Sequence, residues 1–287
     1  MATKALPLFS SQVTFFICLL SLLNGCRNDR DHVEGSSQAA VTAASGVRTY
    51  STAFPQTENP IGEKGTWLGG SAAGASISAG GHLSKEGRLW GDVQTASGLA
   101  FGVDEPTQFG DPTAILTGAW GPDQAVVATV KIVKTPTVNC CKEVELRLRT
   151  TISNYSITGY EAYCSVMPDQ PYCHIARWNG PNGSYWNFET GSSAAYLVNG
   201  DRITATVTGR NPTQISLWKN GVLLLKAQDT GAPGGGFGAY GPFTSGNPGI
   251  GFYDSYDGNW SDFGFSSFSA TDGNPGAVTG SVPHTDR

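Results

Sequence analysis

Short apolar runs separated by turn residues dominate the hydrophobic pattern of the chain between residues 49 and 271. Residues Glu143–Thr151 (EVELRLRTT) alternate strictly between apolar and polar side chains, and Ala125–Val133 (AVVATVKIV) is a continuous run rich in Val. Both patterns predict β-strands, because successive side chains on a strand point to opposite faces. No segment keeps a helical apolar period beyond about two turns. The pattern therefore predicts an all-β chain.

Typical turn sequences mark the connections between further predicted strands. The runs 160–167 and 172–178 flank the turn Pro168-Asp169-Gln170-Pro171, and the run RITATVTG follows Asn199-Gly200-Asp201. Asn220-Gly221 stands between ISLWK and VLLLKA, which is typical of a two-residue type I′ hairpin. The last strand is predicted over Asp262–Ala270, where three phenylalanines suit a strand that closes a sandwich.

The two ends of the chain are predicted to lie outside the folded domain. Lys4 and the apolar run from Val13 to Leu23 are typical of a signal peptide, because the run is too short to span a bilayer. Leu23-Asn24-Gly25-Cys26 resembles a bacterial lipobox, which predicts lipidation of Cys26; the alternative is a soluble secreted chain in which Cys26 is incidental. The predicted organisation is a signal peptide over 1–26, a flexible linker over 27–48, one domain over 49–271 and a disordered tail over 272–287.

Composition and charge agree with this prediction and narrow the function. The chain has 38 Gly, 16 Pro and only 14% charged residues, as expected for many short strands joined by turns. Its formal net charge is −5 with no basic stripe, which argues against nucleic acid as a partner. We expect an exported protein of the cell envelope, attached to the membrane through a lipid anchor only, or a secreted protein.

Four cysteines remain in the predicted domain, and an oxidising compartment favours disulfides between them. Four cysteines allow three connectivities, and their spacing matches no zinc motif. Cys164 and Cys173 flank a turn on neighbouring predicted strands with matched facing, so we expect these two to pair. Cys140 and Cys141 are then left as a vicinal pair or as free thiols.

Counting alternate positions along the strands predicts two faces. Val144, Leu146 and Leu148 occupy one face of the strand at 143–151, with Cys164, Cys173 and Ile175 on the same inward side. The other face is predicted to be an exposed ligand surface for an acidic or neutral glycan. Its members are Glu145, Arg147, Arg149, Tyr163, His174 and Trp178. The alternative is a solvated surface on which arginines and glutamates pair with one another.

Several segments in sequence order resemble the concanavalin A-like lectin/glucanase superfamily, which includes laminin-G-like domains. They are TAFPQTENP-IGEKGTW (52–67), KEVELRLRT, YEAYCSV, YCHIARWNG, NGDRITATVTG, ISLWKNGVLLL, GNPGIGFY and WSDFGFSSFSA. The resemblance implies an antiparallel two-sheet jelly-roll sandwich with a concave and a convex sheet. It also implies that glycans lie across the concave face or the loops at its rim.

The same resemblance implies a possible structural calcium ion between an early loop and the final strand. Glu58, Asn59 and Asp262 would supply its oxygen ligands, with Asp254 and Asp257 as a second choice. The alternative is that these residues only form turns.

Two enzymatic interpretations follow from the resemblance, and the sequence departs from both. Retaining glucanases of this fold carry two catalytic glutamates on one strand, whereas Glu143-Val144-Glu145 has only two-residue spacing and no aspartate between. Alginate-lyase-like members use an Arg-rich strand, a Gln-x-His strand and a late Tyr. Here the corresponding candidates are Arg147 and Arg149, His174 in a Cys-His-Ile context, and Tyr240.

His174 is the candidate general base if one is required, and the alternative is a histidine that hydrogen-bonds on a sheet face. No Gly-x-Ser-x-Gly nucleophile elbow occurs. We therefore predict a non-catalytic carbohydrate-binding or surface-interaction module, with no oligomeric state predicted. The alternatives are a polysaccharide lyase or glycoside hydrolase of the same fold, and a purely structural domain.

Overall fold

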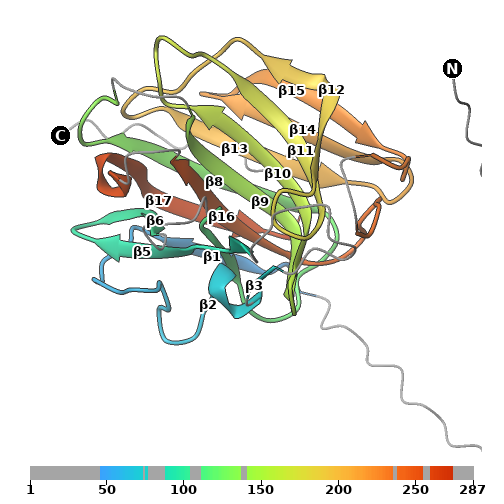
Figure 1. Cartoon of the computed structure of the whole chain (residues 1–287), viewed down its shortest axis with the longest axis horizontal. Helices are drawn as coiled ribbons and strands as arrows, with labels where there is room; N and C mark the ends of the chain where they lie inside the picture. Colours follow the sequence, from blue (N-terminus) through green and yellow to red (C-terminus); the bar gives the residue numbers. More distant parts are fainter. Residues whose placement is uncertain are drawn as a thin grey trace, which may run out of the picture. The chain divides into compact units, whose positions relative to one another are not determined.

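Two antiparallel sheets form the folded domain in the computed structural model (Figure 1). The structure describes residues 46–73, 75–76, 88–103, 111–136, 141–234, 238–254 and 259–273. The signal peptide with Cys26, most of the linker and tail, Cys140 and Asp257 lie outside the described residues. Within the described part of the chain, no helix is long and apolar enough to cross a membrane.

The first sheet has eight strands in the order β15-β14-β13-β8-β17-β6-β5, with β1 paired to β17. Its strands are β1 (Thr49–Thr52), β5 (Asp92–Ala96), β6 (Leu99–Val103), β8 (Gln124–Ile132), β13 (Arg202–Thr208), β14 (Thr213–Lys219), β15 (Val222–Asp229) and β17 (Phe263–Thr271).

The second sheet has seven strands in the order β12-β11-β10-β9-β16-β7-β2. Its strands are β2 (Trp67–Gly69), β7 (Thr113–Leu116), β9 (Lys142–Ser153), β10 (Ser156–Ser165), β11 (Cys173–Gly180), β12 (Tyr185–Ser193) and β16 (Asn247–Asp254). A small third sheet pairs β3 (Ala75–Ser76) with β4 (Arg88–Leu89), and two short 3-10 helices, η1 (Gly70–Ala73) and η2 (Trp260–Asp262), complete the described elements.

The hydrophobic core lies between the two large sheets. Val144, Leu146 and Leu148 of β9 face it from one sheet, and Phe265 and Phe268 of β17 face it from the other. All five side chains are at most 2% exposed, and their burial supplies the main favourable term in folding. The predicted fold class, an antiparallel jelly-roll sandwich, is confirmed.

The strand predictions agree with the structure where the pattern is strongest. The predicted runs at 125–133, 143–151, 160–167 and 172–178 correspond to β8, β9, β10 and β11. Asn220 and Gly221 both have positive φ, 51° and 80°, as the predicted type I′ turn requires. Among strands that the pattern did not predict, β12 (YWNFETGSS) carries Gly, Ser and Asn, residues that are uncommon in strands.

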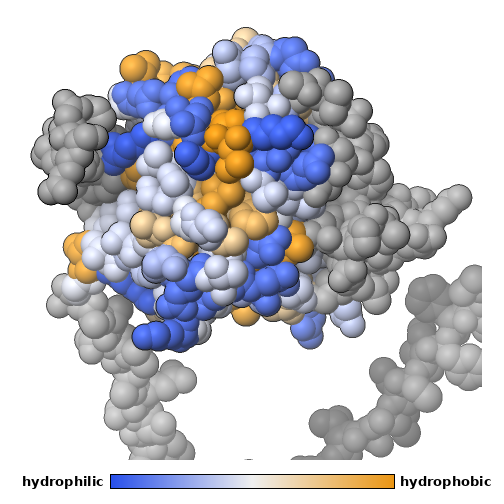
Figure 2. Space-filling view, turned by 90° about the vertical axis from the view of Figure 1, so that its left-hand side faces the viewer, coloured by the Kyte–Doolittle hydropathy of each residue, from blue (hydrophilic) through white to orange (hydrophobic). Residues whose placement is uncertain are grey.

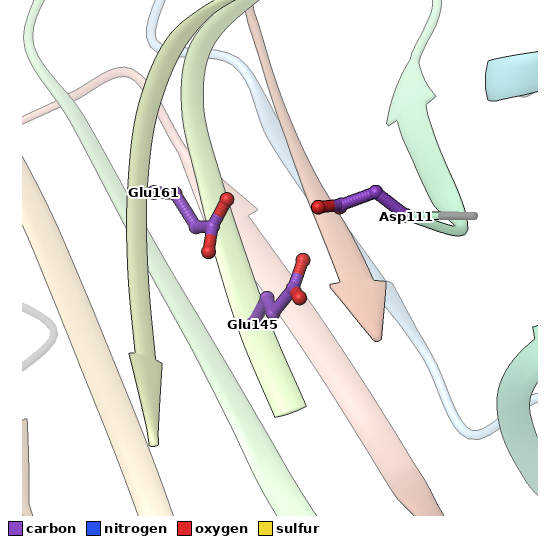
Figure 3. Close-up of side chains that lie close together, drawn as sticks. All are labelled: Asp111, Glu145 and Glu161. Atoms are coloured by element: carbon purple, nitrogen blue, oxygen red, sulfur yellow. The ribbon is translucent and has the colours of Figure 1, made fainter. Parts of the chain in front are cut away.

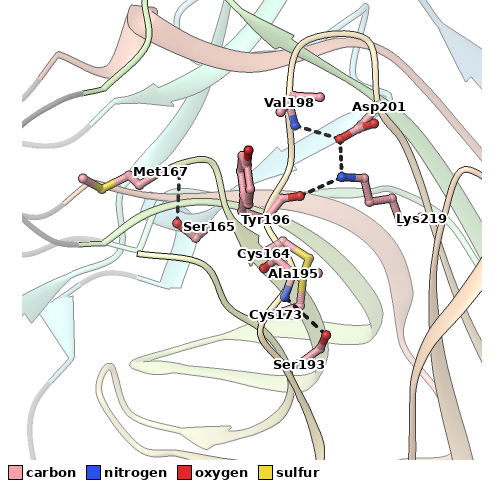
Figure 4. Close-up of a disulfide and its surroundings, with 10 residues drawn as sticks. All are labelled: Cys164, Ser165, Met167, Cys173, Ser193, Ala195, Tyr196, Val198, Asp201 and Lys219. Carbon is pink, nitrogen blue, oxygen red and sulfur yellow. Dashed lines mark hydrogen bonds and ion pairs between the residues drawn. A yellow bond between two sulfur atoms is a disulfide. The ribbon is translucent and has the colours of Figure 1, made fainter. Parts of the chain in front are cut away.

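The disulfide between Cys164 and Cys173 confirms the predicted pairing. The two residues are direct partners across β10 and β11, with Cα atoms 4.0 Å apart. Figure 4 shows the disulfide beside the segment that connects β12 to β13, where Lys219 Nζ donates to the Tyr196 carbonyl. Cys141 is also disulfide-bonded, which excludes the free-thiol alternative for that residue.

One side of the described domain mixes polar and apolar residues (Figure 2). Figure 2 shows a narrow hydrophobic band bordered on both sides by hydrophilic residues. Exposed apolar residues of this kind are ordinary on a soluble domain unless they form a large continuous patch.

Candidate functional site

The face of the seven-stranded sheet that points away from the core carries all the predicted ligand-surface residues except Arg149. Tyr163 is the register partner of Glu145 on β9 and of His174 on β11, so these three side chains share a face. Arg147 and Trp178 lie on the same face and approach each other, with the guanidinium carbon 5.5 Å from the indole centre. The structure therefore places these five residues on the side that period-two counting predicted.

Exposure of this face was predicted wrongly. Glu145 and Arg147 are fully buried, and Trp178 is 4% exposed. Trp90 packs on the Trp178 ring at 4.9 Å between centroids, and Tyr185 approaches it at 5.1 Å. Trp90, between β4 and β5, and Tyr185 of the neighbouring strand β12 thus cover Trp178, a feature that alternation along one strand does not report.

Arg149 leaves the predicted row because a β-bulge interrupts the pairing of β9 with β10. The register shifts between Thr158 and Tyr160, and Arg149 itself has a φ of 47°. A bulge adds a residue to one strand and so reverses the facing beyond it. The Arg149 guanidinium donates to Thr213 Oγ1 at 3.1 Å, and Thr213 belongs to the opposite sheet. Arg149 therefore takes no part in the site on the outer face.

Three buried carboxyl groups surround the Arg147 guanidinium. Nη1 donates to Glu161 Oε2 at 2.5 Å, and Nη2 donates to Glu145 Oε2 at 2.5 Å and to Asp111 Oδ1. Oxygens of the three acids all lie within 4.8 Å of one another. Figure 3 shows the three carboxyl groups pointing toward one another from β9, β10 and the residue two places before β7. We refer to Asp111, Glu145 and Glu161 as the carboxyl cluster.

A glycine on β16 makes room for this arrangement. A Cβ at Gly251 would overlap Glu145 Oε2 and would lie 2.8 Å from Arg147 Nε. Gly251 is the register partner of Glu145, so the cluster lies directly over the glycine. The absence of a side chain at residue 251 is therefore a structural requirement of the carboxyl cluster.

Burial sets the protonation of the cluster. Burial raises the pKa of Glu161 to about 7, against the lowering effect of Arg147. Burial and the neighbouring carboxyls raise the pKa of Glu145 well above its ordinary value of 4.5. Although burial disfavours its charged form, the three carboxylates raise the pKa of Arg147, which stays protonated. One fixed positive charge is therefore shared by three acids, and part of the cluster holds protons near neutral pH.

A cavity of about 260 Å³ opens next to the carboxyl cluster. Asp111 and Glu161 belong both to the cluster and to the wall of the cavity, and Glu143 adds a third carboxyl. The Tyr172 hydroxyl donates to Glu143 Oε1 at 2.5 Å. Burial nevertheless raises the pKa of Glu143 to about 8. The remaining wall is largely aromatic and amide: Tyr163, Trp178, Asn182, Tyr185 and Tyr253.

Sequence reasoning missed two of the acids at this cavity. Glu161 lies two positions before Tyr163, so the same period-two counting that selected Tyr163 could have selected it. Asp111 lies just before β7, and no local pattern brings it to β9 and β10. Only the tertiary fold places Asp111 beside Arg147.

His174 lies near the cavity but does not line it. Its ring centre is 5.4 Å from that of Tyr163 and 5.6 Å from that of Tyr172. Burial lowers the pKa of His174, so the imidazole is neutral at pH 7. Tyr240, the late tyrosine of the lyase interpretation, contacts Arg177, whose guanidinium carbon is 5.7 Å from the Tyr240 ring. The lyase candidates are thus dispersed: Arg149 bonds to the opposite sheet, and Tyr240 lies against Arg177, which also bonds to that sheet.

The residues predicted for calcium have other partners within the described chain. Glu58 Oε2 accepts hydrogen bonds from the backbone N–H groups of Gly62 and Glu63, at 3.0 and 2.9 Å. Asp262 lies 3.7 Å from Lys134 Nζ. Asp254, of the second choice, forms a buried ion pair with Lys142. Calcium at Glu58, Asn59 and Asp262 stays a prediction.

The fold and the cavity define a β-sandwich protein with a candidate ligand site on the outer face of one sheet. No protein-family model matches the chain, and no curated protein matches it.

Solved structures with similar strand arrangements have low sequence identity to this chain. A Bacillus subtilis protein of unknown function with a galectin-like fold is 10% identical, with a TM-score of 0.46 over 78% of this chain and 98% of its own. The carbohydrate-binding module CBM66 from Bacillus subtilis is 12% identical, with a TM-score of 0.39 over 63% of this chain and 88% of its own. Rv0315 of Mycobacterium tuberculosis, described as an immunostimulatory antigen and pseudo β-1,3-glucanase, is 12% identical. Its TM-score is 0.43 over 77% of this chain and 97% of its own. Similarities of this extent define neither a ligand nor an activity.

Proposed function

We propose that this protein is a non-catalytic carbohydrate-binding module that holds a saccharide in the cavity on the outer face of the seven-stranded sheet. The observation that carries the proposal is the composition of the cavity wall, in which aromatic rings stand beside carboxyl and amide groups. Aromatic faces pack against the C–H surfaces of sugar rings, and carboxyl and amide groups accept and donate hydrogen bonds to hydroxyls.

Tyr185 is the most accessible aromatic group of this wall. It is 45% exposed and lies against Trp178, which its neighbours hold in place. A rigid buried ring next to a partly exposed ring gives a sugar a preformed surface, which limits the entropy lost on binding.

The protein acts outside the cytoplasm in this proposal, tethered through a lipid on Cys26. The signal-peptide pattern and the lipobox-like sequence that ends at Cys26 support this location. Calcium at Glu58, Asn59 and Asp262 would then stabilise the loop beside β5, since Glu58 already bridges to Thr95 of that strand.

A glycan array on the purified protein, followed by calorimetry on each hit, tests the proposal. Tyr185→Ala is expected to weaken binding by about 1–3 kcal/mol without loss of folding. Tyr155→Ala is the matched control, because Tyr155 is 48% exposed and does not line the cavity. Equal losses in the two variants, or no binding to any glycan, would reject the cavity as a saccharide site.

A glycoside hydrolase is the second candidate, and a specific observation favours it. Glu143 and Glu161 line the same cavity, and burial raises their pKa values to about 8 and about 7. A carboxyl group that is protonated at neutral pH can act as the general acid of glycoside hydrolysis. Release of reducing ends from a polysaccharide would replace the non-catalytic proposal if Glu161→Gln abolished that release.

A further inference from the structure

We propose that the saccharide recognised by this cavity carries a positive charge, and that its chemical class is an amino sugar with a free ammonium group. This inference rests on the proposed carbohydrate-binding function and names the class of carbohydrate. Four features of the site support it, each independent of the similarity to other folds.

The charge of the cavity wall is the first feature. Asp111, Glu143 and Glu161 line the cavity, and its described lining residues include no Lys, Arg or His. A uronate or a sulfated sugar would find no cation among these lining residues, and every carboxyl group that ionises there has its own sign. An ammonium group would instead form charge-assisted hydrogen bonds, which are stronger than neutral ones.

The bonding of Arg147 is the second feature. Arg147 contacts two residues of the cavity wall, Asp111 and Glu161, but it is fully buried and both of its terminal nitrogens bond to carboxyl oxygens. Its Nε has no hydrogen-bond partner among the described residues, but this nitrogen is buried beside Gly251, so Arg147 offers no accessible donor to a ligand carboxylate. Arg147 balances one of the three negative charges that full ionisation of the cluster would produce.

An unused acceptor within the cluster is the third feature. Glu145 Oε1 is buried and accepts no hydrogen bond from an N–H or O–H group of another described residue, so its carboxyl group is left to share a proton with Asp111. Its carboxyl group points toward Asp111 and Glu161, which themselves face the cavity (Figure 3). Buried acceptors in native proteins usually have a donor, so an acceptor left over beside an acidic cavity indicates a cationic or donor-rich ligand.

The aromatic wall is the fourth feature. Trp178 and Tyr185 line the cavity, and the half-exposed ring of Tyr185 can attract an ammonium group, since cations are drawn to the faces of aromatic rings. The same rings also pack against the carbon skeleton of a sugar. A simple metal ion would use the carboxyl oxygens but would leave these rings without a role.

Proton release on binding follows from the same geometry and gives a readout that a merely structural role would not produce. A bound cation favours the ionised forms of Glu143 and Glu161, whose pKa values lie near neutrality, so binding at pH 7 expels protons. The charged and titratable groups that face these two carboxyls from the packed elements are Asp111, Glu145, Arg147, Tyr163, Tyr172, Tyr185 and Tyr253, the register partner of Glu143 on β16.

Calorimetry with four oligosaccharides of equal length tests the proposal on the purified protein. They are a glucosamine oligomer, its N-acetylated form, a glucose oligomer and a galacturonate oligomer. We expect the glucosamine oligomer to bind at least about tenfold more tightly than the other three, the gain expected for one or two charge-assisted hydrogen bonds. The buffer takes up the protons that binding releases. The measured binding enthalpy is therefore expected to become more exothermic in buffers with a larger ionisation enthalpy.

Glu143→Gln keeps the acceptor for the Tyr172 hydroxyl and removes only the charge, so folding is preserved. This variant should lose most of the preference for the glucosamine oligomer, measured as the ratio of its affinity to that of the glucose oligomer. Asp169→Asn is the matched control, because Asp169 is an exposed turn residue that does not line the cavity.

Two negative outcomes are distinguishable. If none of the four oligomers binds and the glycan array is also negative, the proposed function itself fails. If the N-acetylated, neutral or acidic oligomer binds as tightly as the glucosamine oligomer, or if Glu143→Gln keeps the preference, the charge-based inference fails while carbohydrate binding stands.

Discussion

Single residues on the outer face of the seven-stranded sheet contribute to stability before they contribute to recognition. Removing Arg147 would leave three buried carboxyl groups without their cation, which typically costs about 3–5 kcal/mol. Trp178→Ala would remove a buried ring and the indole donor of Glu161, with an expected cost of about 3–5 kcal/mol. Urea unfolding of the Arg147→Ala and Trp178→Ala variants measures these two losses in the free energy of unfolding.

Tyr155→Ala serves as the surface control for these variants, with an expected change within about 0.5 kcal/mol. A Trp178→Ala protein with the unfolding midpoint of the wild type and impaired glycan binding would contradict the packing role. Such a result would support the exposed ligand surface that the sequence pattern predicts.

The protonation of Glu143 predicts a pH dependence of stability. Burial raises the pKa of Glu143 from its ordinary 4.5 to about 8, so between these values the folded state holds a proton that the unfolded state has released. The stability that this bound proton gives the folded state is therefore complete below pH 4.5 and is lost as the pH rises through about 8. We expect the melting temperature to fall between pH 5 and pH 8, less steeply in Glu143→Gln than in the wild type.

His174 affects stability in the opposite direction. Burial lowers its pKa, so below pH 6.5 the unfolded state binds more protons than the folded state, and stability falls as the pH is lowered. The comparison with Glu143→Gln removes this background, since both proteins keep His174. Identical pH profiles for the two proteins would show that Glu143 titrates normally in the folded state.

At the scale of elements, the disulfide fastens the hairpin of β10 and β11. It joins residues nine apart in sequence, and closing a loop of this size stabilises a fold by about 2–3 kcal/mol in the chain-entropy account. We expect a double variant, Cys164→Ala with Cys173→Ala, to lose about this amount in denaturant unfolding. Glycan affinity should be unchanged in the folded double variant, because both sulfurs lie on the core side, away from the cavity.

The contact between β16 and β9 depends on glycine at residue 251. Gly251→Ala would force the Glu145 and Arg147 side chains to shift, and overpacking of this kind typically costs about 1–3 kcal/mol. Gly62→Ala is the control, since a Cβ there would meet only Glu58 Oε1 at 3.9 Å. Thermal unfolding compares the two, and equal melting temperatures would show that the cluster adapts without cost.

At the scale of the whole molecule, the domain is expected to be held at a membrane surface by Cys26. Cys26→Ser is predicted to release the protein from the membrane fraction and to abolish incorporation of a labelled fatty acid. The folded domain should keep its melting temperature, because Thr49 begins the first described strand well after the anchor. Membrane retention of the serine variant without the label would contradict lipid anchoring.

The sequence by itself determined the β-sandwich, the type I′ hairpin at Asn220-Gly221, the Cys164–Cys173 pair and the facing of β9, β10 and β11. These features follow from side-chain alternation and turn chemistry, which act over a few residues.

Only the tertiary structure decided which neighbours each face meets. The bulge between β9 and β10 turned Arg149 toward the other sheet, and Trp90 and Tyr185 covered Trp178. Asp111 reached Arg147 across 36 positions of sequence, and no local pattern encodes such a contact. Burial then moved the carboxyl pKa values toward neutrality, because desolvation depends on the surrounding elements and not on the strand that carries the residue.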